Sequence, residues 1–418
     1  MLLGCIGDDF TGSSDLALTL SKEGMRTVVC CGVPNEGTLM EADSAVVALK
    51  SRTCPVPQAV EESLAALAWL RRQGCQKFFF KYCSTFDSTP QGNIGPVIDA
   101  LMAELQCDLT IVCPAFPATG RTLYNGHLFV QDHLLNESGM ENHPLTPMTD
   151  PDIRRWLAPQ SSRTVGHVPH QEVTTGSDTI RSGLQREAAA GRSLVVVDAI
   201  CEADLRAICL AARDVTLITG GSGIALGLPS VLMSENRKKR PEHQWRGSAK
   251  PAVVLAGSCS KATLEQVARY REDHPSFQID PDLVIAGSQS AAAVADWAVD
   301  HLDRCPMIFS SADPSAIRAV QEKFGRDRSS TAIEIFFAEM ARLLHLQGVG
   351  RLVAAGGETS GAVTAGLEIT ALEVGPEIAP GVPALQSKDP DLVLALKSGN
   401  FGGPDFLAKA VDILGDTR

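Results

Sequence analysis

The chain has 418 residues, a length that favours two domains of roughly 200 residues each over one compact core. Its hydrophobic fraction of 44% and charged fraction of 21% are typical of soluble globular proteins. The net charge of -12 argues against nucleic acid as the main partner, and no apolar run reaches the roughly 18 residues that a membrane-spanning helix needs.

The opening stretch "MLLGCIGDDF" lacks the basic region of a signal peptide and reaches two acidic residues at once. We therefore expect a first strand there and a cytoplasmic protein. The twelve cysteines include no CxxC pair. In a reducing compartment they are expected to be small buried hydrophobic residues rather than metal ligands or disulfides.

The first half alternates apolar strand patterns with patterns of helix length. The expected strands are Leu2–Ile6, Thr27–Cys31, Ala45–Ala48, Lys77–Phe80, Leu109–Val112, Leu194–Val197 and Thr216–Ile218. The expected helices are Ser13–Glu23, Pro57–Gln73, Pro96–Leu105, Asp178–Ala190 and Ala203–Ala212. This alternation indicates βαβ units and a mainly parallel sheet. Residues 124–177 show little periodicity, and a loop of that length inside a compact domain usually carries function.

Residues 234–249 break the pattern with charge, proline and no apolar face, and are predicted to be a linker. Their basic cluster "RKKR" is interpreted as part of this solvated linker, the alternative being a binding patch. The linker separates a domain over 1–233 from a domain over 250–418.

The second domain is expected to repeat the alternation. Its expected strands are Ala252–Ala256, Asp282–Ala286, Met307–Ser310 and Arg351–Ala355, and its expected helices are Ala291–Leu302, Ser330–Gln347 and Ala362–Leu367. The predicted fold class is therefore α/β, with each domain built on a mainly parallel β-sheet flanked by helices and a cleft between the domains.

In open α/β sheets, ligands collect where strands end and helices begin, and four strand ends of the first domain are unusually polar. In "GDDFTGSSD", the acids Asp8 and Asp9 exceed what capping of the next helix needs. In "KYCSTFDSTPQGN", the last residues are typical of a turn, but Lys81, Ser84 and Asp87 are not explained that way. A lysine directly after a buried strand is well placed to bind a carboxylate or phosphate.

The third polar strand end, "CPAFPATGRTLYNGH", contains Asn125 and His127. The fourth, "VGHVPHQEVTTGSD", contains His167 and His170. These two histidines lack the partnered spacing of metal ligands, so they are interpreted as ordinary polar loop residues.

The second domain offers glycines and hydroxyl groups. "AAGGETSGAV" at 354–363 predicts a strand, a glycine-rich turn and a helix start, whose backbone N–H groups suit the phosphates of a nucleotide. "AGSCSKAT" at 256–263 has the same order, and "SGNFGG" at 398–403 adds a third turn. The Walker A, GxGxxG and HExxH motifs are absent, and no GxSxG comes with a credible triad. The three turns together favour a nucleotide site outside these motif classes.

Four motifs in order, "GDDFTGSSD", "KYCSTFDSTPQGNIGPV", "CPAFPATGRTLYNGHLFV" and "AAGGETSGAV", resemble the four-carbon acid sugar kinases over essentially the whole chain. The form "KYCSTFDSTPQGN" looks like the 3-oxo-tetronate 4-kinases rather than the threonate or erythronate kinases. The resemblance implies an N-terminal domain that binds the sugar acid and a C-terminal domain that binds ATP, with Mg²⁺ as a further cofactor.

Residue by residue, the resemblance implies catalytic roles for Asp9, Asp87 and Lys81. It implies substrate-binding roles for Asp8, Arg52, Ser84, Asn125 and His127, although Arg52 rests on its strand-end position alone. ATP-binding roles fall to Ser258, Gly357, Glu358, Thr359, Ser360 and Gly399, and no metal ligand is identified. Lys81 or Arg52 would supply a cation for the substrate carboxylate, and Asp9 or Asp87 would accept the proton of its terminal hydroxyl.

The leading hypothesis is an ATP-dependent kinase for the 4-hydroxyl of 3-oxo-tetronate. The alternatives are a D-threonate or D-erythronate 4-kinase, and a sugar-acid binding or sensing protein without turnover. The expected partners are the sugar acid and ATP, with neither nucleic acid nor membrane. The sequence leaves open the stereochemistry of the substrate and which aspartate is the base. It also leaves open the oligomeric state, and a homo-oligomer is one of the alternatives.

Overall fold

The computed structural model describes residues 1–35, 40–143, 145–233, 245–311, 320 and 322–416. Two compact units divide the chain, Met1–Glu242 and His243–Arg418. The predicted linker lies outside the described residues over 234–244, and with it the whole basic cluster "RKKR". In the described ranges, no helix is long and apolar enough to cross a membrane.

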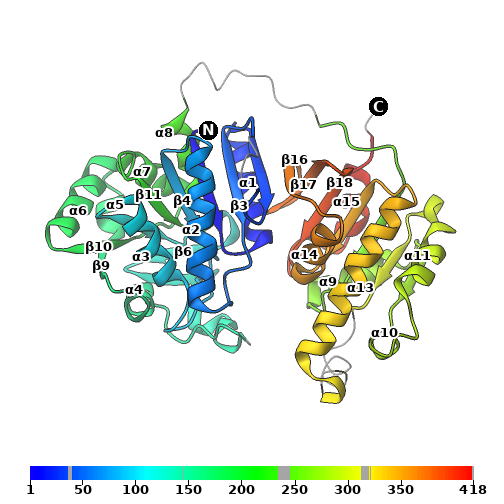
Figure 1. Cartoon of the computed structure of the whole chain (residues 1–418). Helices are drawn as coiled ribbons and strands as arrows, with labels where there is room; N and C mark the ends of the chain where they lie inside the picture. The colour runs from blue at the N-terminus through cyan, green and yellow to red at the C-terminus, as the bar shows by residue number, and fades with distance from the viewer. Residues whose placement is uncertain (36–39, 144, 234–244, 312–319, 321, 417–418) are drawn as a thin grey trace. The chain divides into compact units, whose positions relative to one another are not determined.

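The N-terminal unit is a parallel sheet with helices on both faces (Figure 1). Its strand order is β2-β3-β1-β4-β11-β5-β10-β9. The strands are β1 (Leu3–Gly7), β2 (Thr27–Cys31), β3 (Ser44–Ala48), β4 (Lys77–Lys81), β5 (Thr110–Cys113), β9 (Thr164–Val168), β10 (Arg192–Val197) and β11 (Leu217–Gly220). The α-helices are α1 (Phe10–Lys22), α2 (Val56–Arg72), α3 (Ile94–Leu105), α4 (Ile153–Leu157), α5 (His170–Val173), α6 (Ser177–Ala189), α7 (Glu202–Ala211) and α8 (Leu228–Leu232).

The strands of this sheet, β9 excepted, were predictable because both faces of the sheet are covered. Every residue of β1, β3 and β4 is buried, which is why these strands read as continuous apolar runs in the sequence. In the order β2-β3-β1-β4, the connection from β1 to β2 skips over β3 toward one edge of the sheet. The connection from β3 to β4 skips over β1 toward the other edge, so the two crossovers run in opposite directions. Ligands of such sheets bind at the carboxyl ends of the strands beside this reversal, here the ends of β1 and β4.

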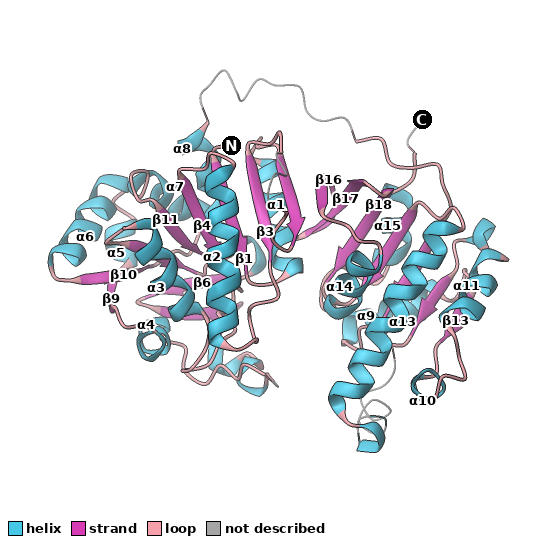
Figure 2. Ribbon diagram, viewed as in Figure 1, coloured by secondary structure: helices cyan, strands magenta, loops and turns pink. Residues whose placement is uncertain are grey.

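The C-terminal unit has the strand order β13-β14-β12-β15-β18-β17-β16. The first five strands are parallel, and the last two each run antiparallel to their neighbours (Figure 2). The strands are β12 (Ala252–Ala256), β13 (Ser276–Gln278), β14 (Met307–Phe309), β15 (Arg351–Ala355), β16 (Ala371–Ala379), β17 (Val382–Lys388) and β18 (Asp391–Lys397). The α-helices are α9 (Lys261–Tyr270), α10 (Pro281–Ile285), α11 (Ala291–Val299), α13 (Arg326–Leu346), α14 (Gly357–Gly366) and α15 (Phe406–Ile413). The predicted class, α/β with mainly parallel sheets flanked by helices, is confirmed.

One predicted strand is wrong. Residues 282–285 belong to helix α10, Ala286 is its C-cap, and the strand in this region is β13. The carboxylate of Asp280 accepts the N–H groups of Asp282 and Leu283 at 2.9 and 3.4 Å, and Pro281 opens the helix. An aspartate cap followed by proline is a helix start, and it outweighs the short apolar run that suggested a strand.

The region 124–177 contains more regular structure than its weak periodicity predicted. Besides α4, α5 and β9, it holds most of a separate antiparallel sheet made of β6 (Arg121–Tyr124), β7 (His127–Val130) and β8 (His133–Leu134). Strand β9 pairs with β10 and so belongs to the main sheet. Its sequence "TVGHV" interrupts the apolar pattern with glycine and histidine, which hid the strand.

Candidate functional site

Polar residues meet where β1, β3 and β4 end. Asp8 and Asp9 follow β1, Arg52 comes after β3, and Lys81 is the last residue of β4. The main chain fixes these places, because the N–H groups of Ser51 and Arg52 donate to the carbonyl oxygen of Asp8 at 3.0 and 3.2 Å. The N–H group of Asp8 in turn donates to the carbonyl oxygen of Lys81 at 3.0 Å.

Arg52 joins three carboxylates. Its Nε and Nη2 donate to the two oxygens of Asp8 at 2.8 and 2.9 Å. Its Nη2 also lies 2.7 Å from Oδ1 of Asp9, and its Nη1 lies 3.8 Å from Oδ2 of Asp87. Lys81 donates from Nζ to Oδ1 of Asp9 at 3.3 Å. We call these five residues the Arg52 cluster; its two cations and three carboxylates carry a formal charge of -1.

The cluster gives its two adjacent aspartates different acidities. Burial raises the pKa of Asp8, and the guanidinium of Arg52 offsets this only in part. Burial acts on Asp9 too, but Arg52 and Lys81 together hold the pKa of Asp9 well below its usual value. Asp9 is therefore a persistent carboxylate and a weak base, suited to accepting a hydrogen bond from a hydroxyl.

The loop after β4 carries the remaining predicted residues of this region. The hydroxyl of Thr85 donates to Oδ1 of Asp87 at 2.6 Å and fixes the carboxylate in place. Ser84 is half-buried, and within the described residues its hydroxyl makes no hydrogen bond. Ser84 can therefore offer both a donor and an acceptor to a ligand.

Two residues that the sequence did not single out support the Arg52 cluster. The side chain of Asn93 donates to the carbonyl oxygen of Ser51 at 2.7 Å and secures the loop that carries Arg52. A Cβ placed on Gly12 would collide with Nζ of Lys81 and with Asp9, so only glycine lets α1 approach the ion pair this closely. The role of Asn93 was hidden because residues 91–93 look like an ordinary turn in the sequence. The role of Gly12 depends on how α1 packs against Lys81, which the sequence does not show.

Asn125 lies in the turn between β6 and β7, and His127 is the first residue of β7. The ring Nδ1 of His127 lies 2.8 Å from the carbonyl oxygen of Asn125, and the turn itself packs on a different residue, Asp198, which follows β10. The fully buried carboxylate of Asp198 accepts the N–H groups of Asn125 and Gly126 at 2.6 and 2.9 Å. Nε2 of His167 lies 3.0 Å from the same carboxylate. His167 is therefore not the ordinary polar loop residue that was predicted, because it lies in strand β9 and pairs with a buried aspartate. The described contacts do not join this group to the Arg52 cluster, although both lie at the carboxyl edge of one parallel sheet.

In the C-terminal unit, the predicted turns after β12, β15 and β18 lie against one another. A Cβ on Gly399, after β18, would collide with the hydroxyl of Ser258, after β12. Gly356, after β15, has a φ of 135°, and a Cβ there would crowd the backbone nitrogen of Ser258 at 3.1 Å. Glycine permits both the close approach and the backbone conformation. The three turns therefore form one surface rich in main-chain groups.

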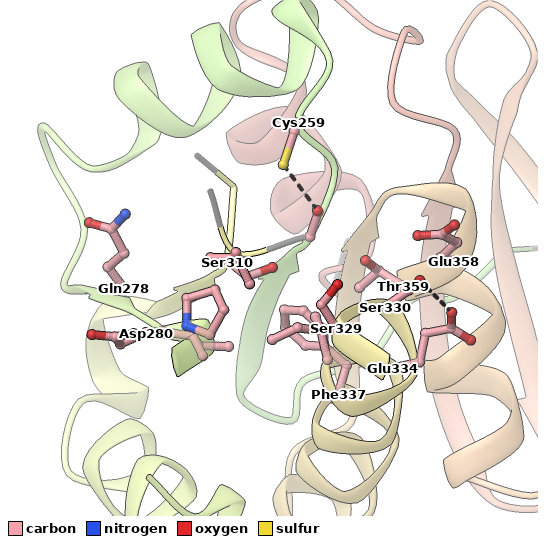
Figure 3. Close-up of a pocket in the computed structure, with 15 residues that line it drawn as sticks. Cys259, Gln278, Asp280, Ser310, Ser329, Ser330, Glu334, Phe337, Glu358 and Thr359 are labelled. Atoms are coloured by element: carbon pink, nitrogen blue, oxygen red, sulfur yellow. Dashed lines mark hydrogen bonds between the residues drawn. The ribbon is translucent and has the colours of Figure 1, made fainter. Parts of the chain in front are cut away.

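A cavity of about 510 Å³ adjoins the turns after β12 and β15. It is lined by Gly257, Cys259, Gln278, Ile279, Asp280, Pro281, Ser310, Val320, Ser329, Ser330, Ile333, Glu334, Phe337, Glu358 and Thr359. Figure 3 shows Gln278 and Asp280 across from Glu358 and Thr359, with Phe337 of α13 between them. The walls combine apolar side chains such as Ile279, Ile333 and Phe337 with polar ones, a combination that suits an organic ligand with hydrogen-bonding groups.

Of the four predicted ATP-binding residues at the start of α14, two line the cavity and two do not. Glu358 and Thr359 line the cavity in the first turn, where an α-helix leaves N–H groups without intrahelical partners. Gly357 is exposed, with open space where a Cβ would point. Ser360 is fully buried, and its hydroxyl donates to the carbonyl oxygens of Ala354 and Lys397 at 3.4 and 3.5 Å. The side chain of Ser360 therefore holds the helix against the sheet and does not face the cavity.

Family models match both units. A model described as a sugar-binding N-terminal domain matches residues 3–228, and one described as a nucleotide-binding C-terminal domain matches residues 253–407. A Cupriavidus necator protein named 3-oxo-tetronate kinase is 50% identical, over 99% of this chain and 97% of the relative. A Burkholderia multivorans protein of the same name is 49% identical, with the same coverage of both chains. The chain belongs to the four-carbon acid sugar kinase family.

Solved structures extend this family likeness to the fold. A Haemophilus influenzae protein is 43% identical with a TM-score of 0.83, over 98% of this chain and 100% of that chain. A Salmonella typhimurium protein is 42% identical with a TM-score of 0.88, over 98% of each chain. The resemblance to the four-carbon acid sugar kinases, predicted from four motifs, is confirmed over nearly the full length.

Two buried charged residues at strand ends, Asp198 and Lys397, were not singled out from the sequence. Asp198 directly follows the apolar run "LVVV", as Asp8 follows the first strand. Lys397 ends the apolar strand β18 as Lys81 ends β4. A search for every charged residue that directly ends an apolar run would have found both.

Proposed function

We propose that the chain is an ATP-dependent kinase that phosphorylates the terminal (4-) hydroxyl of 3-oxo-tetronate, giving 3-oxo-tetronate 4-phosphate. The observation that carries the proposal is the 50% identity with the C. necator 3-oxo-tetronate kinase over 99% of this chain. In the proposal, residues 1–233 bind the sugar acid, residues 234–249 are a linker, and residues 250–418 bind the nucleotide.

The charge of the Arg52 cluster refines the proposed binding of the acid. Arg52 and Lys81 are both engaged with carboxylates, so neither is a free cation waiting for the substrate carboxylate. The described contacts nevertheless use only one of the three hydrogens of the Lys81 ammonium, which leaves two to donate to substrate oxygens. We assign to Lys81 a donor role toward the acid, with Ser84, Asn125 and His127 as further contacts.

The transfer step needs positioning more than strong base chemistry. The oxygen of the 4-hydroxyl bonds to the γ-phosphorus of ATP as the bond to the bridging β,γ-oxygen breaks, and the hydroxyl proton leaves late, through the hydrogen-bonded carboxylate to water. A carboxylate of depressed pKa such as Asp9 suits this role, because it orients the hydroxyl through a hydrogen bond without removing the proton early. Asp87, held by Thr85, is the second candidate acceptor.

For the nucleotide, we propose that the phosphates bind at the turns of Ser258, Gly357 and Gly399 and that the nucleoside occupies the cavity beside Phe337. The N–H groups at the start of α14 suit phosphate oxygens. No group of three or more histidine, cysteine, aspartate or glutamate side chains in the described ranges could hold a metal ion. Mg²⁺ would therefore be bound mostly by the phosphates and water, with Glu358 as the one carboxylate at the helix start.

The test is a coupled assay of ADP release on a panel of four-carbon acids with MgATP. We expect turnover with 3-oxo-tetronate and a much lower kcat/KM with D-threonate and D-erythronate. Turnover with D-threonate or D-erythronate but not with 3-oxo-tetronate would contradict the proposed substrate and leave a threonate or erythronate kinase. Binding of an acid without ADP release from any of them would overturn the kinase and favour a sensing protein.

Lys81→Met should raise the KM for the acid by about 10- to 100-fold, because a charge-assisted hydrogen bond to the substrate is lost. The matched control is Lys77→Met. Lys77 is also buried and donates to carbonyl oxygens, but at the amino end of the same strand. Steady-state kinetics check the prediction, and equal KM values for the two variants would contradict it.

We also propose a cytoplasmic location, where ATP is available. All twelve cysteines are free thiols in the structure, which fits a reducing compartment. Fractionation of cells that express the tagged chain tests this, and recovery in a membrane or extracellular fraction would contradict it.

A further inference from the structure

Lys397 is a buried lysine with an unusual set of partners. Its side chain has no exposed surface, and its Nζ donates to the hydroxyl of Thr263 at 3.0 Å and to the carbonyl oxygens of Ser398 and Gly399 at 3.1 and 3.0 Å. These three oxygens use all the hydrogens of the ammonium. All three are formally uncharged, so hydrogen bonding is satisfied while the positive charge is not.

No described contact joins the Lys397 ammonium to a carboxylate. The charged groups on the elements packed around it are Lys261, Glu265 and Arg269 of α9, Arg351 of β15, Glu358 of α14, Lys388 of β17, Asp391 of β18, and Asp405, Lys409 and Asp412 at or in α15. The Lys397 ammonium also faces the ring of Phe406, whose centre lies 5.7 Å from Nζ. A buried charge without a counter-ion is costly, so its presence requires a reason.

The position of Lys397 supplies a reason. Its carbonyl oxygen accepts the N–H group of Gly356 at 2.9 Å, and its ammonium holds the Ser398–Gly399 turn against Thr263 of α9. Thr263 also donates to the carbonyl oxygen of Gly399 at 2.9 Å. One side chain thus ties together the turn after β18 and the start of α9, at the surface to which we assign the phosphates.

We propose that Lys397 is a positioning residue of the nucleotide site, whose buried charge orders the Gly399 turn and is balanced by the phosphates of the bound nucleotide. The inference rests on the proposed function, because it takes the phosphates to bind at these turns. It predicts that affinity gained through Lys397 increases with the charge of the nucleotide. Adenosine, which has no phosphate, gains nothing from it.

Protonation gives a signature that a purely structural residue would not produce. Burial lowers the pKa of Lys397 to about 8, so in the free protein the ammonium is partly deprotonated at pH 8. A bound polyphosphate stabilises the charged form and raises this pKa. Binding of ATP should therefore be accompanied by uptake of about half a proton at pH 8, and by almost none from this residue at pH 6.

The experiment measures binding of MgATP, MgADP and adenosine by calorimetry, at pH 8 and pH 6, in buffers of low and high ionisation enthalpy. In Lys397→Met we expect affinity for MgATP to fall by about 10- to 100-fold, affinity for MgADP to fall less, and affinity for adenosine to change less than about twofold. The proton uptake at pH 8 should disappear. Lys397→Gln, which keeps a donor without the charge, serves if the methionine variant does not fold.

Lys77→Met is again the matched control, since burial also lowers the pKa of Lys77 to about 8, in the other unit. It should leave both the affinities and the proton uptake unchanged. Wild-type protein that binds MgATP without proton uptake at pH 8, or a charge-neutral variant with wild-type ratios of the three affinities, would overturn this inference alone. Wild-type protein that binds no MgATP would instead overturn the proposed function.

Discussion

Replacing Arg52 with methionine should lower kcat/KM for the sugar acid by on the order of 10²-fold, because the carboxylates proposed to hold the substrate lose the cation that fixes their positions. Arg52 is the only residue in the described ranges that contacts all three carboxylates of its cluster. Asp8, which is only 4% exposed in the intact protein, loses both of its side-chain hydrogen bonds in the variant. Three neighbouring carboxylates then repel one another with only Lys81 to compensate.

The pH profile should distinguish this cause from simple unfolding. Arg52 is the largest influence that lowers the pKa of Asp9, so in the variant this pKa rises toward its usual value. Asp9 is ionised at higher pH and protonated at lower pH, so the acid limb of the kcat/KM profile should move to higher pH. Arg71→Met, which removes an exposed ion pair with Glu104, is the control and should behave as wild type. An Arg52 variant within threefold of wild type would contradict the proposed site.

Gly399→Ala should raise the KM for ATP by about 10- to 100-fold, as expected for a methyl group forced into a packed contact. The added Cβ would collide with the hydroxyl of Ser258 and would lie 2.8 Å from that of Ser260. The hydroxyls of Ser258 and Ser260 would have to turn away, which breaks the hydrogen bonds that they accept from the N–H groups of Ser260 and Thr263, and the proposed phosphate surface would lose its shape. The KM for the acid should change little, because these residues belong to the nucleotide-binding unit.

Gly403→Ala is the matched control in the same segment. No atom lies within 4 Å of a Cβ built there, and Gly403 does not line the cavity. Its kinetics should equal those of wild type. If the two alanine variants showed the same KM for ATP, the close approach of Gly399 to Ser258 would have no part in nucleotide binding.

The parallel strands were predictable because burial on both faces leaves a direct mark in the sequence. β16 and β17 left a weaker mark, whereas β18, "DLVLALK", is an apolar run that was overlooked. β16 contains Gly375 and Pro376, β17 contains Pro383, and the pairing of β16 with β17 shifts register twice. Glycine and proline normally argue against a strand interior, and irregular pairing accommodates them here. Local sequence does not reveal the neighbouring strand that makes this possible.

The site divides in the same way. Asp8, Asp9, Lys81 and Asp87 could be predicted because each follows an apolar strand within a few residues, and parallel strands bring such residues to one edge. That Arg52 would already be paired with these acids could not be predicted, since its contact with Asp8 spans 44 positions of sequence. The buried role of Ser360 likewise depends on β18, which the sequence analysis did not recognise.

The formal charge of the Arg52 cluster bears on how the reaction ends. The proposed substrate brings a neutral hydroxyl to the carboxylates, whereas the product carries a phosphate of nearly two negative charges at the same carbon. Asp9 keeps its negative charge at all physiological pH values, because its pKa is held so low. The site that orients the alcohol therefore repels its ester, and this repulsion would speed departure of the product and limit its inhibition of the enzyme.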